Sequence, residues 1–238
     1  MRKYILENEK NIRDIGGYNT KEGILNYDKI IRGENLSNIT DNDIKFFNDN
    51  NINVIDIRSQ NEKEKYPDKI KNNYYSINLK RTRFPKTQKD IPITYMEVLE
   101  DYDNIKKILE LIANIDDTIY IHCKNGKDRT GIIIMIIMMI CNCDDNSIIE
   151  EYSKTDYYFI DHYNNYHKEN PKSPLWLGKA KAKYMKETLN LFNNKYQNID
   201  NYLKLLNVSN KTITRIKKDL IHRRKLLCLS YQCFSQSH

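Results

Sequence analysis

A cysteine and an arginine six residues apart carry the clearest chemical signal in this sequence. Cys123 follows a short apolar stretch, Arg129 precedes another, and the string between His122 and Gly131 reads HCKNGKDRTG. A loop that leaves a strand and enters a helix can turn successive N–H groups toward an anion, and an arginine can bind phosphate through two parallel hydrogen bonds. We therefore expect the loop to bind a phosphate group, with Cys123 as the nucleophile and Arg129 gripping the phosphate.

The same surroundings favour a reactive thiolate at Cys123. A helix N-terminus and a nearby cation lower the pKa of a cysteine by roughly one to five units. The sulfur can then attack phosphorus at neutral pH and form a cysteinyl-phosphate that water hydrolyses. His122 is expected to orient the loop, Thr130 to donate its hydroxyl to the sulfur, and Gly126 to permit a backbone conformation that a side chain would hinder. We expect the substrate to contact these loop residues: Lys124, Asn125, Gly126 and Thr130.

The leaving oxygen of a phosphate ester needs a proton, so the reaction needs a general acid. Asp128 lies inside the loop and is the first candidate. Asp90 is the second, because it lies on a proline-flanked segment 33 residues before Cys123. Asp101 and Asp103 are weaker candidates because both fall within a predicted helix.

Short apolar strands alternate with helices along the first part of the chain. This order predicts an α/β fold with a central, mostly parallel sheet flanked by helices on both faces. In such sheets ligands bind beyond the carboxyl ends of the strands, where the loop at 122–130 would lie. We expect strands over 53–57, 74–79 and 118–121, a strand or hairpin over 24–33, helices over 41–50, 95–113 and 130–141, and a loop over 80–94.

The chain after the loop helix is rich in tyrosine, which we interpret as packing and surface residues. A break at Pro171 and Pro174 separates this stretch from further helical segments. We expect a single domain over 1–227, helices over 179–193 and 211–227, and a frayed tail over 228–238. Three charged residues near predicted strand ends are interpreted as scaffolding that pairs or holds turns: Arg13, Asp14 and Arg58.

The charge, the cysteines and the apolar segments limit the kinds of protein that this sequence can encode. A formal net charge of +7 suits anionic substrates, but no nucleic-acid-binding motif accompanies it. The five cysteines match no disulfide or zinc spacing, so we expect reduced thiols in a reducing compartment. We expect no cofactor. The longest apolar run, 132–141, is about half of a bilayer span, and the N-terminus lacks a signal-peptide core. We expect a soluble cytoplasmic protein, leaving open export without a cleavable signal and the oligomeric state.

The string HCKNGKDRTG resembles the signature of the protein-tyrosine-phosphatase superfamily, Cys, five residues, Arg. It is most similar to an atypical branch of bacterial and fungal tyrosine and lipid phosphatases, whose loop reads HCxxGKDRTG. Two departures stand out: Gly33 replaces the serine of the branch, and a Trp-Pro-Asp acid loop is missing. Upstream segments resemble motifs of that branch in the same order: Asn11–Gly17, Ile31–Gly33 with Leu36, Ser37 and Thr40, and Asp56–Ser59 with Glu62.

The resemblance implies an α/β phosphatase fold that needs no metal, with the general acid at Asp128. It also implies that Lys127 helps to bind highly charged head groups, as in members that accept phosphoinositides. Some members carry a helical lid after the loop helix, and the segment 145–180 is where such a lid would fall.

Several readings of the function stay open. Within a phosphomonoester hydrolase, phosphoproteins (phosphotyrosine first, with dual specificity for phosphoserine and phosphothreonine) compete with phosphoinositides. A deep slot favours phosphotyrosine, and a wide basic pocket favours inositol rings. A phosphate-binding module without turnover is disfavoured by the complete set of Cys123, Asp128 and Arg129. A sulfur-transfer or arsenate-reducing enzyme is disfavoured by the Arg-Thr-Gly ending of the loop.

Overall fold

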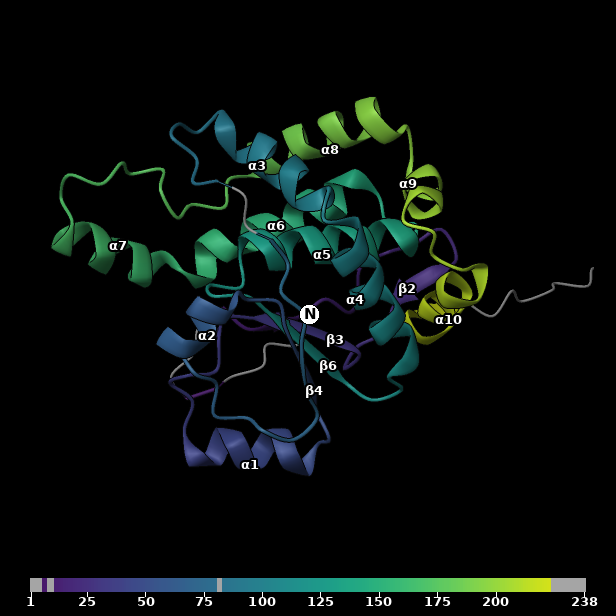
Figure 1. Ribbon diagram of the computed structural model, residues 1–238, viewed down its shortest axis with the longest axis horizontal. Helices are drawn as coiled ribbons and strands as arrows, with labels where there is room; N and C mark the ends of the chain where they lie inside the picture. The colour runs from purple at the N-terminus through teal and green to yellow at the C-terminus, as the bar shows by residue number, and fades with distance from the viewer. Residues whose placement is uncertain (1–5, 8–10, 81–82, 224–238) are drawn as a thin grey trace, which may run out of the picture.

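A five-stranded sheet forms the centre of the molecule (Figure 1). The computed structural model describes residues 6–7, 11–80 and 83–223. The strand order is β1-β3-β6-β4-β5; β1 pairs antiparallel with β3, and the other neighbours pair in parallel, as predicted. The strands are β1 (Arg13–Asp14), β3 (Ile30–Gly33), β4 (Asn53–Asp56), β5 (Tyr74–Ser76) and β6 (Ile119–His122).

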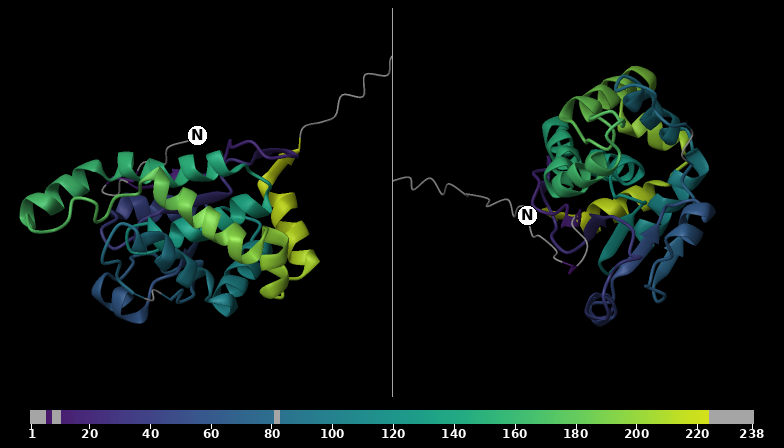
Figure 2. Two further views of the ribbon diagram at one scale, coloured as in Figure 1. Left: turned by 90° about the horizontal axis from the view of Figure 1, so that it is seen from above. Right: turned by 90° about the vertical axis from the view of Figure 1, so that its left-hand side faces the viewer.

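Ten helices accompany the sheet in the described part of the chain, and α7 extends away from the rest of the molecule (Figures 1 and 2). A second sheet pairs β2 (Gly23–Leu25) with β7 (Ile221–Arg223). Among these ten helices, none combines the length and the apolar character that a bilayer span requires. The helices are α1 (Asp41–Asp49), α2 (Gln60–Lys65), α3 (Asp90–Leu99), α4 (Tyr102–Asn114), α5 (Asp128–Ile140), α6 (Asp145–Tyr158), α7 (Ile160–Glu169), α8 (Ala182–Tyr196), α9 (Ile199–Leu205) and α10 (Asn210–Leu220).

Helices cover both faces of the sheet. Neighbouring residues of a strand point to opposite faces, so one strand contributes side chains to two apolar cores. On β6, Ile119 and Ile121 belong to the larger apolar core, which contains most of α5. Tyr120, between them, belongs to a smaller core on the other face. Its ring packs edge-on against Phe47 of α1, with 5.4 Å between the ring centroids. The α/β fold with helices on both faces is therefore confirmed.

The helix that we expected over 95–113 is instead two helices, and the first begins inside the expected loop over 80–94. α3 starts at Asp90, whose carboxylate accepts hydrogen bonds from two amides of the preceding turn. Pro92 fits there because the first turn of a helix leaves its N–H groups without partners in the helix. The chain breaks again at Asp101, whose carboxylate accepts a hydrogen bond from a distant backbone amide at 2.9 Å. A segment that is periodic throughout is therefore divided at Asp101, where the side chain bonds to another part of the backbone.

Two further expectations need correction. The segment 24–33 holds two strands that belong to different sheets, with β2 pairing to β7 and β3 lying in the central sheet. The helix expected over 211–227 ends at Leu220, because the chain then pairs with β2 as β7. The rest of that expected helix and the tail over 228–238 lie outside the described residues.

α6 docks onto the sheet through buried charges. The Glu151 carboxylate lies 2.8 Å from Arg13 Nε of β1 and 2.5 Å from Arg32 Nη1 of β3. Burial alone would raise the pKa of Glu151, but the two guanidinium groups outweigh burial and hold the pKa below its usual value. Arg13 Nη2 also donates to the Glu151 carbonyl at 2.8 Å. One carboxylate thus joins α6 to two strands.

Removing this carboxylate is predicted to destabilise the protein strongly. Glu151→Ala leaves Arg13 and Arg32 buried without their counter-charge, so we expect the free energy of unfolding to fall by about 3–5 kcal/mol in urea titrations. Glu150→Ala is the matched control, because Glu150 pairs with Lys154 on the exposed side of the same helix, a contact worth about 0.3–0.5 kcal/mol. Equal losses in the two variants would contradict this account.

Candidate active site

The loop over 123–127 joins the carboxyl end of β6 to the first residue of α5. It packs tightly against the end of β3: Gly126 has a φ of +63°, and a Cβ there would lie 2.2 Å from the Gly33 carbonyl oxygen. Gly33 is constrained in turn, since a Cβ on it would lie 2.0 Å from the Tyr120 hydroxyl. The glycine at this position, where the resembling branch has serine, therefore matches the bulk of Tyr120.

Four consecutive carbonyl groups of the loop are bonded to the surrounding scaffold. The donors are side chains whose contact with the loop is not evident from the sequence, although Asn11 and Arg32 belong to segments that resemble family motifs. Spacing along the sequence gives no sign of these contacts, because they join residues far apart in the chain. The bonds are Asn35 Nδ2 to Lys124 O (2.9 Å), Asn11 Nδ2 to Asn125 O (2.8 Å), and Arg32 Nη2 to Gly126 O (2.5 Å) and to Lys127 O (3.3 Å).

These outward bonds fix the direction of the loop amides. In a trans peptide the N–H points opposite to the carbonyl, so the amides of residues 125–128 point away from the side chains that bind these carbonyls. Successive amides aimed at one point bind anions, and the N-terminus of α5 adds its positive dipole end. Chemically, such a loop can bind a phosphate-sized anion beside Cys123.

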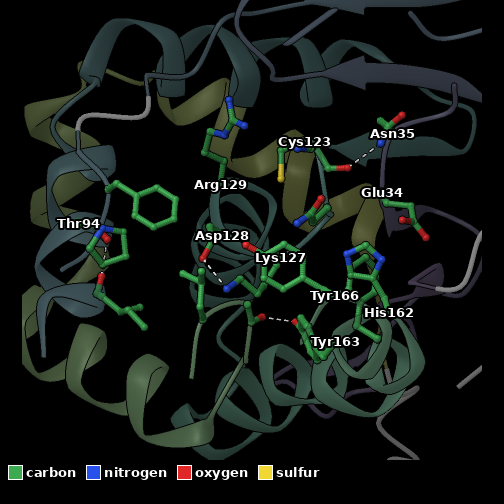
Figure 3. Close-up of a pocket in the computed structure, with 18 of the residues that line it drawn as sticks. Glu34, Asn35, Thr94, Cys123, Lys127, Asp128, Arg129, His162, Tyr163 and Tyr166 are labelled. Atoms are coloured by element: carbon green, nitrogen blue, oxygen red, sulfur yellow. Dashed lines mark hydrogen bonds and ion pairs between the residues drawn. The ribbon is translucent and has the colours of Figure 1, made fainter. Parts of the chain in front are cut away.

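Cys123 lies at the base of this loop, with its sulfur directed toward the cavity (Figure 3). Burial alone would raise the pKa of the thiol. The Arg129 guanidinium, together with the adjacent Thr130, outweighs burial and holds the pKa of Cys123 below its ordinary value, while the nearby Asp128 carboxylate acts in the opposite direction. By contrast, burial raises the pKa of Cys143, beyond the other end of α5, to about 12. Of these two thiols, only Cys123 has an environment that favours a nucleophilic thiolate.

Arg129 is held in place by Glu62 of α2. Its Nη1 and Nη2 atoms donate to the two Glu62 oxygens at 2.8 Å and 2.6 Å. Burial opposes ionisation of Glu62, but the hydrogen bonds and charge of Arg129 and the hydrogen bonds from Ser59 lower its pKa to about 2. Ser59 and Glu62 form the capping box that begins α2. Arginine carries five N–H donors, so this pairing leaves donors for the oxygens of a bound phosphate.

The two candidate acids occupy different positions. Asp128 is the first residue of α5 and lines the cavity. Its Oδ1 atom accepts a hydrogen bond from the Tyr95 hydroxyl at 2.6 Å and lies 3.3 Å from Lys127 Nζ. Asp90 instead bonds to the turn before α3: hydrogen bonds from Thr87 lower the pKa of its carboxylate, and the residue lies outside the cavity lining. This geometry favours Asp128 over Asp90.

A cavity of about 710 Å³ opens in front of the loop (Figure 3). Of the loop residues expected to contact substrate, Gly126 and Thr130 lie behind this lining. Gly126 packs on β3, and Thr130 is fully buried. Lys124 is directed across the ring of Tyr66, with its Nζ atom 4.7 Å from the ring centroid. The loop residues that line the cavity are Cys123, Lys124, Asn125, Lys127, Asp128 and Arg129.

The segment expected to form a lid, 145–180, supplies the opposite wall of the cavity. In Figure 3, Tyr163 and Tyr166 of α7 lie across the cavity from Cys123. The Tyr163 hydroxyl donates to the Gly178 carbonyl, and Lys179 Nζ lies 4.5 Å from the centroid of the same ring. α7 and the chain that follows it are therefore joined beside the cavity.

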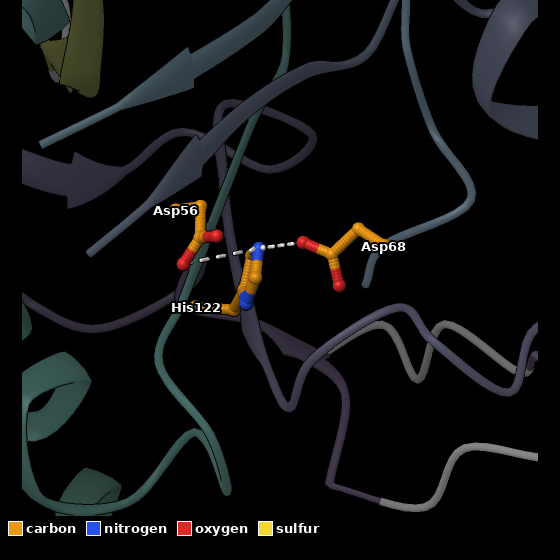
Figure 4. Close-up of side chains that lie close together, drawn as sticks. All are labelled: Asp56, Asp68 and His122. Atoms are coloured by element: carbon orange, nitrogen blue, oxygen red, sulfur yellow. Dashed lines mark ion pairs between the residues drawn. The ribbon is translucent and has the colours of Figure 1, made fainter. Parts of the chain in front are cut away.

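A buried ionic cluster lies behind the loop (Figure 4). His122 Nδ1 is 3.0 Å from the Cys123 carbonyl oxygen, and its Nε2 is 3.1 Å from an Asp68 oxygen. Burial would lower the pKa of His122, but the carboxylates of Asp68 and Asp56 outweigh burial and raise it. The three side chains lie close enough to bind a cation, yet Arg58 already donates to both carboxylates. The expectations that His122 orients the loop and that Arg58 is scaffolding fit this geometry.

The thiolate at Cys123 is predicted to depend on Arg129. Alkylation by iodoacetamide requires the thiolate, so its rate rises with pH through the pKa of Cys123 and levels off above it. In Arg129→Ala the pKa should rise, and at neutral pH the rate should fall roughly tenfold or more. Lys124→Ala is the control, because it removes a cation of the same loop whose Nζ atom lies over the ring of Tyr66. An unchanged profile in Arg129→Ala would contradict the assignment.

Comparison with known proteins identifies the family to which this chain belongs. Residues 4–222 match the model of the tyrosine phosphatase family, a range that includes the whole loop and every residue lining the cavity. A search of curated proteins found no match. The family match spans most of the chain, and members of this family cleave phosphoric monoesters. This chain therefore belongs to the tyrosine phosphatase family and is a phosphoric monoester hydrolase.

Proposed function

We propose that this phosphatase acts through a cysteinyl-phosphate on Cys123 and takes phosphotyrosine in proteins as its main substrate, with dual specificity for phosphoserine and phosphothreonine. One observation carries the mechanism: a thiol with a lowered pKa lies beside four loop amides whose carbonyls are bonded outward. Arg129 completes this site from the first turn of α5. The donors that bind the dianion also stabilise the charge that develops in the transition state.

The reaction takes place in two steps. In the first, the Cys123 thiolate attacks phosphorus, the S–P bond forms, and the P–O bond to the leaving group breaks while Asp128, as the carboxylic acid, gives its proton to the leaving oxygen. In the second, water attacks phosphorus, the Asp128 carboxylate takes a proton from the water, and the S–P bond breaks to return the thiolate. Thr130, which helps to keep the sulfur anionic, favours its departure.

The cavity walls support an aromatic phosphate ester. Large rings surround the space in front of Cys123, and rings stack favourably on or beside one another. A volume of about 710 Å³ exceeds what one phosphotyrosine side chain needs, so part of the surrounding peptide can enter as well. We interpret 145–180 as the cover of the active site. The aromatic residues that line the cavity are Tyr66, Phe84, Tyr95, Phe159, Tyr163, Tyr166 and Trp176.

Phosphoinositides are the second candidate substrate. Lys124, Lys127 and Arg83 all line the cavity and could bind the additional phosphates of an inositol ring. Lys127 is already engaged, because its Nζ atom lies 3.3 Å from Asp128 and 3.4 Å from the Lys179 carbonyl. We therefore rank the lipid second. A binding module without turnover is a poor match, since nucleophile, acid and arginine all line one cavity.

Parallel turnover assays test this proposal. The enzyme, assayed in the presence of a metal chelator, should release phosphate from phosphotyrosyl peptides faster than from phosphoseryl peptides or from vesicles containing phosphoinositides. Cys123→Ser removes the nucleophilic sulfur and should reduce every rate to the level without enzyme, while substrate binding persists. Turnover by Cys123→Ser at the unmodified enzyme's rate would disprove the nucleophile, and faster release from phosphoinositides would overturn the ranking of substrates.

A further inference from the structure

Two buried tyrosines form a hydrogen-bonded chain that ends on Asp128. The Tyr95 hydroxyl of α3 donates to Asp128 Oδ1 at 2.6 Å. The Tyr152 hydroxyl of α6 lies 2.6 Å from the Tyr95 hydroxyl. Both side chains are almost completely buried, with 2 % and 1 % of their surfaces exposed. Side chains of α3, α5 and α6 are thus joined in one hydrogen-bonded chain.

The hydrogen bonds in this series all donate in one direction, from Tyr152 through Tyr95 to Asp128. A tyrosine hydroxyl has one proton to donate. Since Tyr95 donates its proton to Asp128 Oδ1, Tyr152 must be the donor in the contact between the two hydroxyls. Each bond polarises the next in a buried setting, and a hydrogen bond to an ionised carboxylate is roughly twice as strong as one between neutral groups. The arrangement is therefore strongest when Asp128 carries its charge.

Packing keeps both hydroxyls in place. The two rings meet edge-to-face, with 6.0 Å between their centroids and 75° between their planes. Tyr152 also packs on the first turns of α5, where a Cβ at Gly131 would lie 3.1 Å from its ring. Its neighbour in sequence, Glu151, bonds to Arg32, which holds the loop carbonyls. α6 therefore supports the loop backbone and the Asp128 side chain through adjacent residues.

We infer that Tyr95 is a positioning residue for the general acid, with Tyr152 fixing Tyr95 from behind. The inference rests on the proposed function, in which Asp128 protonates the leaving group and then activates water. Asp128 opens α5 beside the cavity, and a side chain there would otherwise sample several rotamers. The Tyr95 hydroxyl holds one carboxylate oxygen, and so fixes the orientation of the carboxylate toward the oxygen that leaves phosphorus.

The test is the dependence of kcat/KM on the leaving group, measured with a series of aryl phosphates. Protonation matters most for poor leaving groups, so Tyr95→Phe should lower kcat/KM roughly tenfold for phenyl phosphate and hardly at all for dinitrophenyl phosphate. Tyr152→Phe should show the same pattern with a smaller loss. Tyr202→Phe is the matched control, because it removes another buried hydroxyl that donates to α3, at the Leu99 carbonyl, far from Asp128. It should leave the series unchanged.

A double-mutant cycle completes the test. In the Asp128→Asn background, Tyr95→Phe should cause no further loss, because the two residues act through the same proton transfer. Losses that are equal for all leaving groups, or additive with Asp128→Asn, overturn the inference and leave the proposed function intact. An Asp128→Asn enzyme with the leaving-group dependence of the unmodified protein overturns the acid assignment as well. If Tyr95→Phe does not fold, Tyr152→Phe in both backgrounds decides the matter by the same criteria.

Discussion

The direction of four peptide groups is the constraint on which this active site depends. Free loop amides would point in many directions, and a dianion would have to order them at a cost in conformational entropy. Here Asn11, Arg32 and Asn35 bond the carbonyls of residues 124–127, and we infer that the amides of residues 125–128 face the cavity as a consequence. The Arg129 guanidinium, which lowers the pKa of Cys123, is likewise held in place by the scaffold, through its two hydrogen bonds to Glu62.

Buried charges support this arrangement from behind. Taking Arg13, Arg32 and Glu151 out of water costs several kcal/mol per ion, and the cost is offset because each guanidinium finds a carboxylate. The same network places α6, so that Tyr152 reaches the hydroxyl of Tyr95. Stability and catalysis are therefore linked: the helix that satisfies the buried arginines also provides the support for the acid.

The parts of the site that lie next to one another along the chain could be predicted from the sequence. The apolar strand before Cys123, the polar loop and the apolar helix after it all appear in the structure where the sequence indicates them. Arg32 and Glu151 could not be assigned in this way, because Arg32 bonds a loop carbonyl 94 residues away and Glu151 pairs with Arg13 across 138 residues. Tyr95 has the spacing of an ordinary core residue, and its hydroxyl contact becomes visible once α3 is placed beside α5.

Trapping the covalent intermediate tests the central claim most directly. Asp128→Asn with dinitrophenyl phosphate should accumulate it, because this leaving group needs no acid while the second step lacks its base. After rapid acid quench, mass spectrometry of peptides should locate one phosphate on Cys123 during turnover, and none in the Asp128→Asn, Cys123→Ser double variant. Phosphate on another residue, or steady turnover with no covalent phosphate at any time, would contradict the account.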